Sequence, residues 1–171
     1  MPAGLLSAAM AMTPDDLLDH LDSLGLETTT HQHAAVFTVD ESKALRSDMP
    51  GGHCKSLFLK DKKGQLWLVV ALEDRAIDMK ELRRRIGAAQ LSFGKPELLA
   101  EVLAVEPGSV TPFALVNDPD HRVNVILDAE MMTYDPLNYH PLINTATTAI
   151  APADLLAFIA ECGHQARVVE L

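Results

Sequence analysis

Three short stretches of this 171-residue sequence carry residues that could bind a small ligand or act on it. The first is Lys55, a cation at the start of an apolar stretch. The second is Pro107–Pro112, which reads Pro-Gly-Ser-Val-Thr-Pro, and the third is His140, which precedes a proline. For His140, a structural role in a proline turn is the simpler alternative. These stretches are far apart in the chain, so only the fold could make them one site.

The segment Pro107–Pro112 has the composition of a stiff loop. Proline fixes φ and withdraws a backbone donor, whereas glycine permits a positive φ, so such a loop holds N–H and C=O groups facing outward. Stiff loops on a scaffold are common places for recognition of small ligands. From these residues alone, a tight turn that joins a helix to a strand is the simpler interpretation.

Other residues suggest chemistry less strongly. Lys55 could point across the rim of a pocket, or it could extend to solvent. His31 and His33 share one face of a predicted strand and could join His53 and Cys54 in a zinc site, but their spacing matches no recognised ligand pattern. We therefore expect no metal. Cys54 has no histidine at a diagnostic spacing, and the sequence contains no P-loop, Gly-x-Ser-x-Gly or Gly-x-Gly-x-x-Gly motif.

Charge is unevenly distributed along the chain. The formal net charge of −10 argues against a general nucleic-acid binder, and we expect no DNA partner. Residues 43–95, however, contain twelve basic and six acidic residues, a net charge of +6, while the remainder carries −16. A basic sector on an acidic body can meet a polyanion at one face, although a solvated surface is the alternative. Three adjacent cations of this sector are Arg83, Arg84 and Arg85.

Length and composition predict one folded domain. With 48% apolar residues, the chain can bury a substantial core, and no apolar run approaches the roughly 18 residues of a membrane span. The N-terminus lacks the basic region and longer apolar core of a signal peptide, and two cysteines without an export signal favour a reducing cytoplasm. We expect residues 1–12 to be a frayed extension and residues 13–171 to be a single domain.

Hydrophobic periodicity and capping signals predict helices and strands that alternate irregularly. Helices are expected over Thr13–Leu24, Asp40–Arg46, Asp78–Ile86, Lys95–Ala104 and Pro152–Cys162, with a helical turn over Asp128–Met132. Strands are expected over Thr28–His33, Val36–Val39, Lys55–Lys60, Gln65–Leu72, Gln90–Phe93, Arg122–Leu127, Tyr134–His140, Leu142–Thr148 and Gln165–Leu171. Because hairpins occur as well as helical connections, the pattern favours an α+β fold with a mixed, curved and partly closed sheet flanked by helices.

Four pieces of the chain, in their order and spacing, resemble the prolyl-tRNA editing family. This is the YbaK-like domain, which occurs inside some prolyl-tRNA synthetases and as free-standing deacylases. The pieces are Cys54–Asp61, Leu91–Gly94, Gly108–Ala114 and Asn138–Asn144. The resemblance runs from about Thr13 to the C-terminus, and it implies a barrel-like mixed sheet flanked by helices.

Within this family the chain is most similar to free-standing, ProX-type proteins that deacylate alanyl-tRNA(Pro). The loop that begins at Gly108 reads Gly-Ser-Val-Thr-Pro-Phe, whereas cysteinyl-tRNA(Pro) deacylases carry Ser-Pro-Gly-type loops. The resemblance implies a trans-editing deacylase of mischarged alanyl-tRNA(Pro) that needs no cofactor and no membrane. A deacylase for cysteinyl- or seryl-tRNA, a non-catalytic tRNA-binding module and a metal hydrolase using His31, His33 and His53 remain alternatives. Whether prolyl-tRNA synthetase is a further partner stays open.

The resemblance also implies roles for individual residues. Lys55 would anchor the 3′-terminal adenosine or its phosphate and orient the ester, while water attacks with help from the terminal ribose hydroxyl. The loop backbone would hold the alanyl α-amine, and His140 would close or order the site. Charge and exposure, rather than a motif, suggest the three arginines for acceptor-stem phosphates. The expected substrate-binding residues are Gly108, Ser109, Val110, Thr111, Pro112 and His140.

Overall fold

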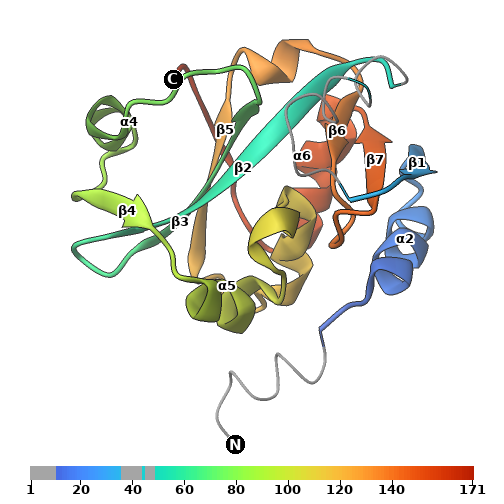
Figure 1. The fold of residues 1–171 in the computed structure, drawn as a ribbon, viewed down its shortest axis with the longest axis horizontal. Helices are drawn as coiled ribbons and strands as arrows, with labels where there is room; N and C mark the ends of the chain where they lie inside the picture. Colours follow the sequence, from blue (N-terminus) through green and yellow to red (C-terminus); the bar gives the residue numbers. More distant parts are fainter. Residues whose placement is uncertain (1–10, 36–43, 45–48) are drawn as a thin grey trace, which may run out of the picture.

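A mixed sheet of eight strands forms the centre of the molecule (Figure 1). The computed structural model describes residues 11–35, 44 and 49–171. Its strands are β1 (Thr28–Gln32), β2 (Gly52–Asp61), β3 (Leu66–Leu72), β4 (Leu91–Phe93), β5 (Val123–Asp128), β6 (Leu137–Tyr139), β7 (Ala146–Ile150) and β8 (Arg167–Val169). Their order is β1-β7-β6-β2-β3-β5-β8, with β4 paired to β2.

The sheet combines parallel and antiparallel pairs, as the sequence predicts. β2 pairs antiparallel with β3 and β4 but parallel with β6, and β3 pairs parallel with β5. Among the described residues, β1 and β8 end the strand order without pairing to each other, so the sheet stays open. The α+β prediction with a mixed sheet is therefore confirmed.

Helices cover both faces of this sheet (Figure 1). They are α2 (Pro14–Ser23), α4 (Met79–Ile86), α5 (Pro96–Leu103) and α6 (Pro152–Glu161). A larger apolar core joins the sheet to α2, α5 and α6, and a smaller core lies beneath α4. None of the helices in the described part of the chain has the length and apolar character needed to cross a membrane.

Helix α2 begins where its capping signal predicts. The Thr13 hydroxyl accepts a hydrogen bond from the Asp16 backbone N–H at 3.1 Å, and the Asp16 carboxylate accepts from the Thr13 N–H at 3.1 Å. This reciprocal pair satisfies two N–H groups that the first helical turn leaves without partners. Leu17 and Leu21, one turn apart, are fully buried. The apolar face predicted for this helix is confirmed.

The β2–β3 hairpin is the buried centre that its apolar residues indicate. Leu66 to Ala71 are all buried, which confirms a central strand covered on both faces. At the turn, the Asp61 carboxylate accepts hydrogen bonds from the backbone N–H groups of Lys63 and Gln65 and from the Trp67 indole. A buried acid therefore fixes the hairpin at its tip.

Glycine at position 51 lets the start of β2 approach β6. Gly51 has φ of +100°, and a Cβ there would lie 2.1 Å from the Pro136 carbonyl oxygen. The next N–H, that of Gly52, donates to this carbonyl at 2.9 Å. The loop before β2 therefore sets the parallel register that aligns His53 with Asn138.

Two segments differ from the structure expected for them. Pro107–Ser109 and Pro112–Asn117 form short 3₁₀ helices, η1 and η2, so the apolar residues after the loop are helical rather than part of a strand. The Thr111 hydroxyl caps η2 by accepting from the Phe113 N–H. The strands near residue 140 are shorter than predicted because Leu142, with φ of +68°, lies in the turn between them.

The remaining predictions concern a helical turn and segments near the N-terminal half of the chain. A third 3₁₀ turn, η3, covers Met131–Thr133, close to the predicted helical turn. The strand predicted over Val36–Val39, the helix over Asp40–Arg46 except Ala44, and residues 1–10 lie outside the described residues.

Candidate functional site

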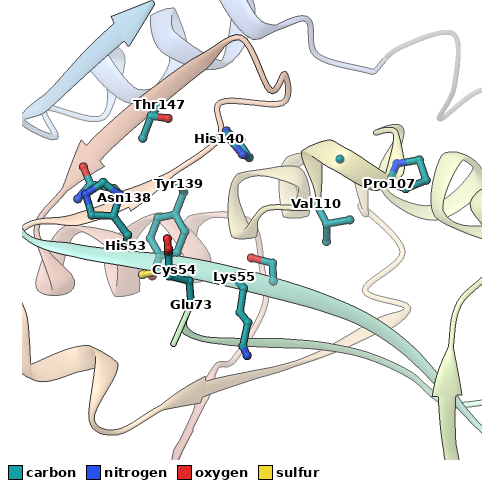
Figure 2. A pocket seen from close by; sticks show the side chains of 12 residues that line it. His53, Cys54, Lys55, Glu73, Pro107, Val110, Asn138, Tyr139, His140 and Thr147 are labelled. Carbon is teal, nitrogen blue, oxygen red and sulfur yellow. The ribbon is translucent and has the colours of Figure 1, made fainter. Parts of the chain in front are cut away.

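A cavity of about 310 Å³ opens between the first half of β2, the η1 turn and strands β6 and β7 (Figure 2). It brings together Lys55, the loop and His140, the three stretches that the sequence singles out. The lining residues are His53, Cys54, Lys55, Ser56, Glu73, Pro107, Gly108, Val110, Asn138, Tyr139, His140 and Thr147.

Only part of the predicted loop lines this cavity. Gly108 and Val110 do so, together with Pro107. Ser109 and Thr111 are 6% and 0% exposed, and neither they nor Pro112 belongs to the lining. The loop thus alternates between residues that wall the cavity and residues that anchor it in the core. Because the buried residues Ser109 and Thr111 hold the chain on both sides of Val110, this wall of the cavity is stiff.

Lys55 lies at the mouth of the cavity with its ammonium group turned away from the loop (Figure 2). Its Nζ donates a hydrogen bond to the Arg75 carbonyl oxygen. Side chains alternate along a strand, and Cys54 packs against the larger core while Leu57 packs against the smaller one. The Lys55 side chain therefore leaves β2 on the face opposite Cys54.

A second cavity of about 670 Å³ adjoins the first and shares His53 and Glu73 with it. Arg75, whose carbonyl binds Lys55, is part of its wall. Tyr134, 38% exposed, is another part. Lys55 therefore lines the first cavity, while its ammonium is bound to a residue of the second.

His140 is held as a neutral imidazole with a defined tautomer. Its Nδ1 lies 3.0 Å from the Ala146 carbonyl oxygen, which can only accept, so Nδ1 carries the proton and Nε2 carries the lone pair. Burial lowers the pKa of His140 below its ordinary value, and His33 nearby lowers it further, although the hydrogen bond to Ala146 acts in the opposite direction. An uncharged acceptor therefore faces this site at neutral pH.

Five lining residues were not singled out by the sequence as site residues: Ser56, Glu73, Asn138, Tyr139 and Thr147. The Asn138 amide donates to the carbonyls of Pro50 and Gly52 at 3.0 and 3.1 Å, which ties β6 to the start of β2. Thr147 lies 2.7 Å from the His33 Nε2 atom. Asn138 and Tyr139 belong to a piece that carries the family resemblance, so a signal for them existed. Thr147 had none.

The Cys54 thiol is not a nucleophile in this environment. Burial raises its pKa to about 12, hydrogen bonds from Tyr139 and from the Asn138 backbone offset this only in part, and the Glu73 charge raises it further. A thiol must lose its proton to attack an ester, and Cys54 retains it at neutral pH.

The three histidines of the metal alternative do not converge on a metal. His53 Nε2 lies 2.9 Å from the Met49 carbonyl oxygen, His33 is bound to Thr147, and His31 is exposed. Within residues 11–35, 44 and 49–171, no group of three or more His, Cys, Asp or Glu side chains could hold a metal ion.

The three arginines lie on α4, away from the cavity. In Figure 1 this helix is at one end of the molecule, whereas β6 and β7 are towards the other. All three side chains are exposed, and Arg84 and Arg85 lie 3.3 and 3.6 Å from Glu81. The structure therefore separates the arginines from the site that it assembles around the loop.

Comparison with known proteins gives consistent matches. Residues 33–158 match the aminoacyl-tRNA editing domain family. Prolyl-tRNA synthetase associated domain-containing protein 1 of Danio rerio is 41% identical over 160 residues, which is 90% of this chain and 87% of the relative. The prolyl-tRNA editing protein ProX of Acetoanaerobium sticklandii is 34% identical over 152 residues, which is 88% of this chain and 93% of that protein.

Solved structures share the fold. The crystal structure of a candidate trans-editing enzyme for prolyl tRNA synthetase superposes with a TM-score of 0.68 at 21% identity. The match covers 94% of this chain and 99% of that one.

Proposed function

Because this chain belongs to the aminoacyl-tRNA editing domain family, we propose that it is a trans-editing deacylase that hydrolyses the ester of mischarged alanyl-tRNA(Pro). The observation that carries the proposal is the small cavity walled by Pro107, Gly108 and Val110. Relatives named for prolyl-tRNA editing and for association with prolyl-tRNA synthetase support the choice of tRNA.

The size of the cavity fits the physics of editing. A synthetase pocket built for proline cannot exclude alanine well, because missing methylene groups are worth only about 1–3 kcal/mol of discrimination. A second and smaller pocket must remove the mischarged product. At about 310 Å³ this cavity is at the small end of ligand pockets, and its stiff wall limits its expansion for a larger side chain.

Hydrolysis then follows from a water molecule and a neutral acceptor. Water oxygen attacks the ester carbonyl, the bond between that carbonyl carbon and the ribose oxygen breaks, and the ribose oxygen takes up a proton. The lone pair on the His140 Nε2 atom can accept a hydrogen bond from the attacking water and order it. The backbone N–H groups of Gly108 and Val110, the loop residues with an N–H that line the cavity, are the proposed partners of the ester oxygen, with the Gly108–Thr111 loop also holding the α-amine.

Lys55 is proposed to bind the tRNA end rather than the amino acid. Lys55 lines the first cavity, and its ammonium is bound to the carbonyl of Arg75, a residue of the second cavity. The two cavities share His53 and Glu73, so an ester bound across both would place its terminal adenosine beside Lys55. This arrangement gives the two cavities separate roles: the first selects the amino acid, and the second holds the nucleoside.

The three adjacent arginines of α4 are proposed to contact acceptor-stem phosphates. They are exposed cations on a helix outside the cavity, where a duplex could approach without entering the amino-acid pocket. Partial pairing of Arg84 and Arg85 with Glu81 leaves their charges accessible to solvent.

A turnover assay with four substrates tests the proposal. Catalytic amounts of the protein are incubated with alanyl-, cysteinyl-, seryl- and prolyl-tRNA(Pro), and release of each amino acid is followed. We expect multiple turnovers on the alanyl ester and none on the prolyl ester. Turnover only on the cysteinyl or seryl ester would assign the alternative substrate, and tRNA binding without turnover would indicate a non-catalytic module. Loss of activity with a chelator would support the metal alternative.

A further inference from the structure

A second surface of the molecule combines an exposed aromatic ring with four lysines. The tip of the β2–β3 hairpin, strand β4 and the start of α5 surround a hollow of about 910 Å³. Five of its lining residues are Lys60, Lys62, Lys63, Phe93 and Lys95, which we call the lysine–phenylalanine patch. None of these residues lines the cavity that contains the loop and His140.

The four lysines of this patch outnumber the acids that line the same hollow. All four lysines are exposed, and none of their ammonium groups has an ion-pair or hydrogen-bond partner in the part of the chain that the structure describes. Three acids line the hollow, and one of them, Glu97, is exposed at the start of α5. The other two are already engaged. Asp61 is buried beneath the hairpin turn, and Glu101 pairs with Arg122 at 2.9 Å. The patch therefore presents cations to a partner that carries negative charge.

Phe93 has no structural reason to face solvent. Its side chain is 64% exposed, the largest fraction among the exposed large apolar side chains of the described residues. The residue paired with it across the strands, Leu59, is fully buried. An aromatic face among cations is the arrangement that binds single-stranded nucleic acid, because every base can stack on the ring while lysines hold the phosphates.

Strand β2 connects this patch with the candidate active site. Ser56, which lines the cavity, and Lys60, in the patch, are four residues apart on one continuous strand, so their side chains leave β2 on the same face. At about 3.3 Å per residue they are about 13 Å apart. Figure 1 shows β2 as the long strand that crosses the molecule between β6 and β4. With about 3.4 Å per stacked nucleotide, a few unpaired nucleotides cover this distance.

We propose that the lysine–phenylalanine patch binds the single-stranded 3′ segment of the tRNA, with Phe93 stacked on one unpaired base and the lysines bound to phosphates. This inference rests on the proposed function only for the choice of RNA. It places the 3′ segment along β2, between the candidate active site and the arginines of α4.

Binding of an uncharged RNA tests the patch without any deacylation. The probe is a fluorescent acceptor-stem hairpin with an unpaired 3′ overhang, and its affinity is measured by anisotropy at several salt concentrations. We expect Phe93→Ala to weaken binding by about 5- to 100-fold with little change in salt dependence, and Phe93→Trp to retain binding. Replacing all four lysines with glutamine should reduce the slope of log K against log salt by about 0.7 for each lost phosphate contact.

The overhang distinguishes this site from a general basic surface. A blunt hairpin without unpaired nucleotides should bind wild type and Phe93→Ala equally. Two matched controls are Leu156→Ala, which removes an exposed apolar side chain on α6, and Lys80→Gln, which removes a cation outside the patch. Both should bind the overhang hairpin as the wild type does. Equal loss of affinity for blunt and overhang hairpins in Phe93→Ala would overturn the proposal.

The two proposals fail in different ways. If patch variants bind the overhang hairpin like wild type while alanyl-tRNA(Pro) is still hydrolysed, the patch proposal is wrong and the proposed function stands. If no aminoacyl ester is hydrolysed but hairpin binding depends on Phe93 and the overhang, the patch stands without the activity. Patch variants with normal RNA binding but lost association with prolyl-tRNA synthetase would assign the surface to a protein partner and overturn the RNA proposal.

Discussion

At the scale of single residues, the site depends on the environment of groups that are ordinary in sequence. His140 is neutral because it is buried beside His33, and Cys54 keeps its proton because burial raises its pKa to about 12. The same two residue types could serve as acid or nucleophile elsewhere. In the proposed mechanism they leave hydrolysis to water, with His140 as the acceptor that orders it.

The first residue-scale prediction concerns the pH dependence of His140. The neutral form is the active one, and its pKa lies below the ordinary value, so activity should fall only as the pH drops through that lowered pKa and should be constant above it. His140→Ala should lower kcat by about 100-fold or more and remove this pH dependence. Rates are measured on alanyl-tRNA(Pro) after subtraction of spontaneous hydrolysis.

The control for this experiment is His20→Ala, which changes a histidine on α2 outside the cavity. It should leave the profile unchanged. A His140→Ala enzyme with the wild-type profile would show that another group gives the pH dependence.

The second residue-scale prediction concerns Lys55. Lys55→Ala should reduce kcat/KM for alanyl-tRNA(Pro) by about 10- to 100-fold, since a hydrogen bond to a charged group contributes about 1.5–3 kcal/mol. Because the ammonium binds one backbone carbonyl at the cavity mouth, the unfolding midpoint should change little. Lys80→Ala is the matched control on α4. Full activity of Lys55→Ala would remove Lys55 from the site.

At the scale of elements, the cavity is made by how a turn and a hairpin are anchored. The η1 turn exposes Val110 to the cavity while Thr111 and Pro112 are buried and begin η2. The β2–β3 hairpin carries Lys55 and is closed by Asp61. Changing the wall should alter selectivity, whereas changing the hairpin turn should alter stability.

The wall is tested by Val110→Ala. Removing two methyl groups enlarges the space beside the amino acid, so hydrolysis of prolyl-tRNA(Pro) should rise by about 10-fold or more relative to alanyl-tRNA(Pro). The same substitution at Val116, which is partly buried in η2 and does not line the cavity, is the control and should leave the ratio unchanged. An unchanged ratio for Val110→Ala would show that this residue does not limit the pocket.

The hairpin is tested by Asp61→Ala. Burial alone would raise the pKa of Asp61, but hydrogen bonds from the Trp67 indole and from the N–H groups of Gln65, Ala89 and Lys63 bring it below its ordinary value. Losing these bonds should lower the free energy of unfolding at pH 7 by about 2–4 kcal/mol, measured by urea denaturation.

The effect of Asp61 on stability should depend on pH in one direction. Since the folded pKa is lowered, the ionised carboxylate stabilises the protein above the unfolded pKa, and this contribution is lost as the pH falls through the folded pKa below 3.8. The difference between wild type and variant should therefore shrink in acid. Asp120→Ala, on an exposed turn, should show no such difference at any pH.

At the scale of the whole molecule, the basic residues are concentrated in one part of the chain. A net charge of −10 repels polyanions from most of the surface, while residues 43–95 carry +6. The arginines of α4 and the lysines of the patch both belong to this sector. A substrate would meet cations along one side of the protein as its ester enters the cavity.

The arginines give the prediction at this scale. Replacing Arg83, Arg84 and Arg85 with alanine should weaken binding of deacylated tRNA and reduce the slope of log K against log salt by about 0.9 for each lost contact with the duplex. The triple variant should still bind the overhang hairpin more tightly than the blunt hairpin, because that difference is attributed to Phe93. A triple variant with an unchanged slope would exclude these arginines from the interface.

Local sequence signals predicted most elements, because capping residues, turns and hydrophobic periodicity act over a few positions. The helix expected from Thr13 and the strands expected over Lys55–Lys60 and Gln65–Leu72 are present as α2, β2 and β3. The order of four short pieces also predicted the family before the site was known. Site roles for Lys55, the loop and His140 came from that resemblance rather than from local pattern.

Only the tertiary structure decided where the side chains of the site point and how they are charged. Residues 53–57 of β2 are all half-buried, so no alternation of buried and exposed positions could show that Lys55 leaves the strand away from the loop. Thr147 and the neutral state of His140 likewise depend on contacts between segments distant in sequence. The burial and the direction of a side chain depend on how distant elements pack together, so short-range sequence patterns do not predict them.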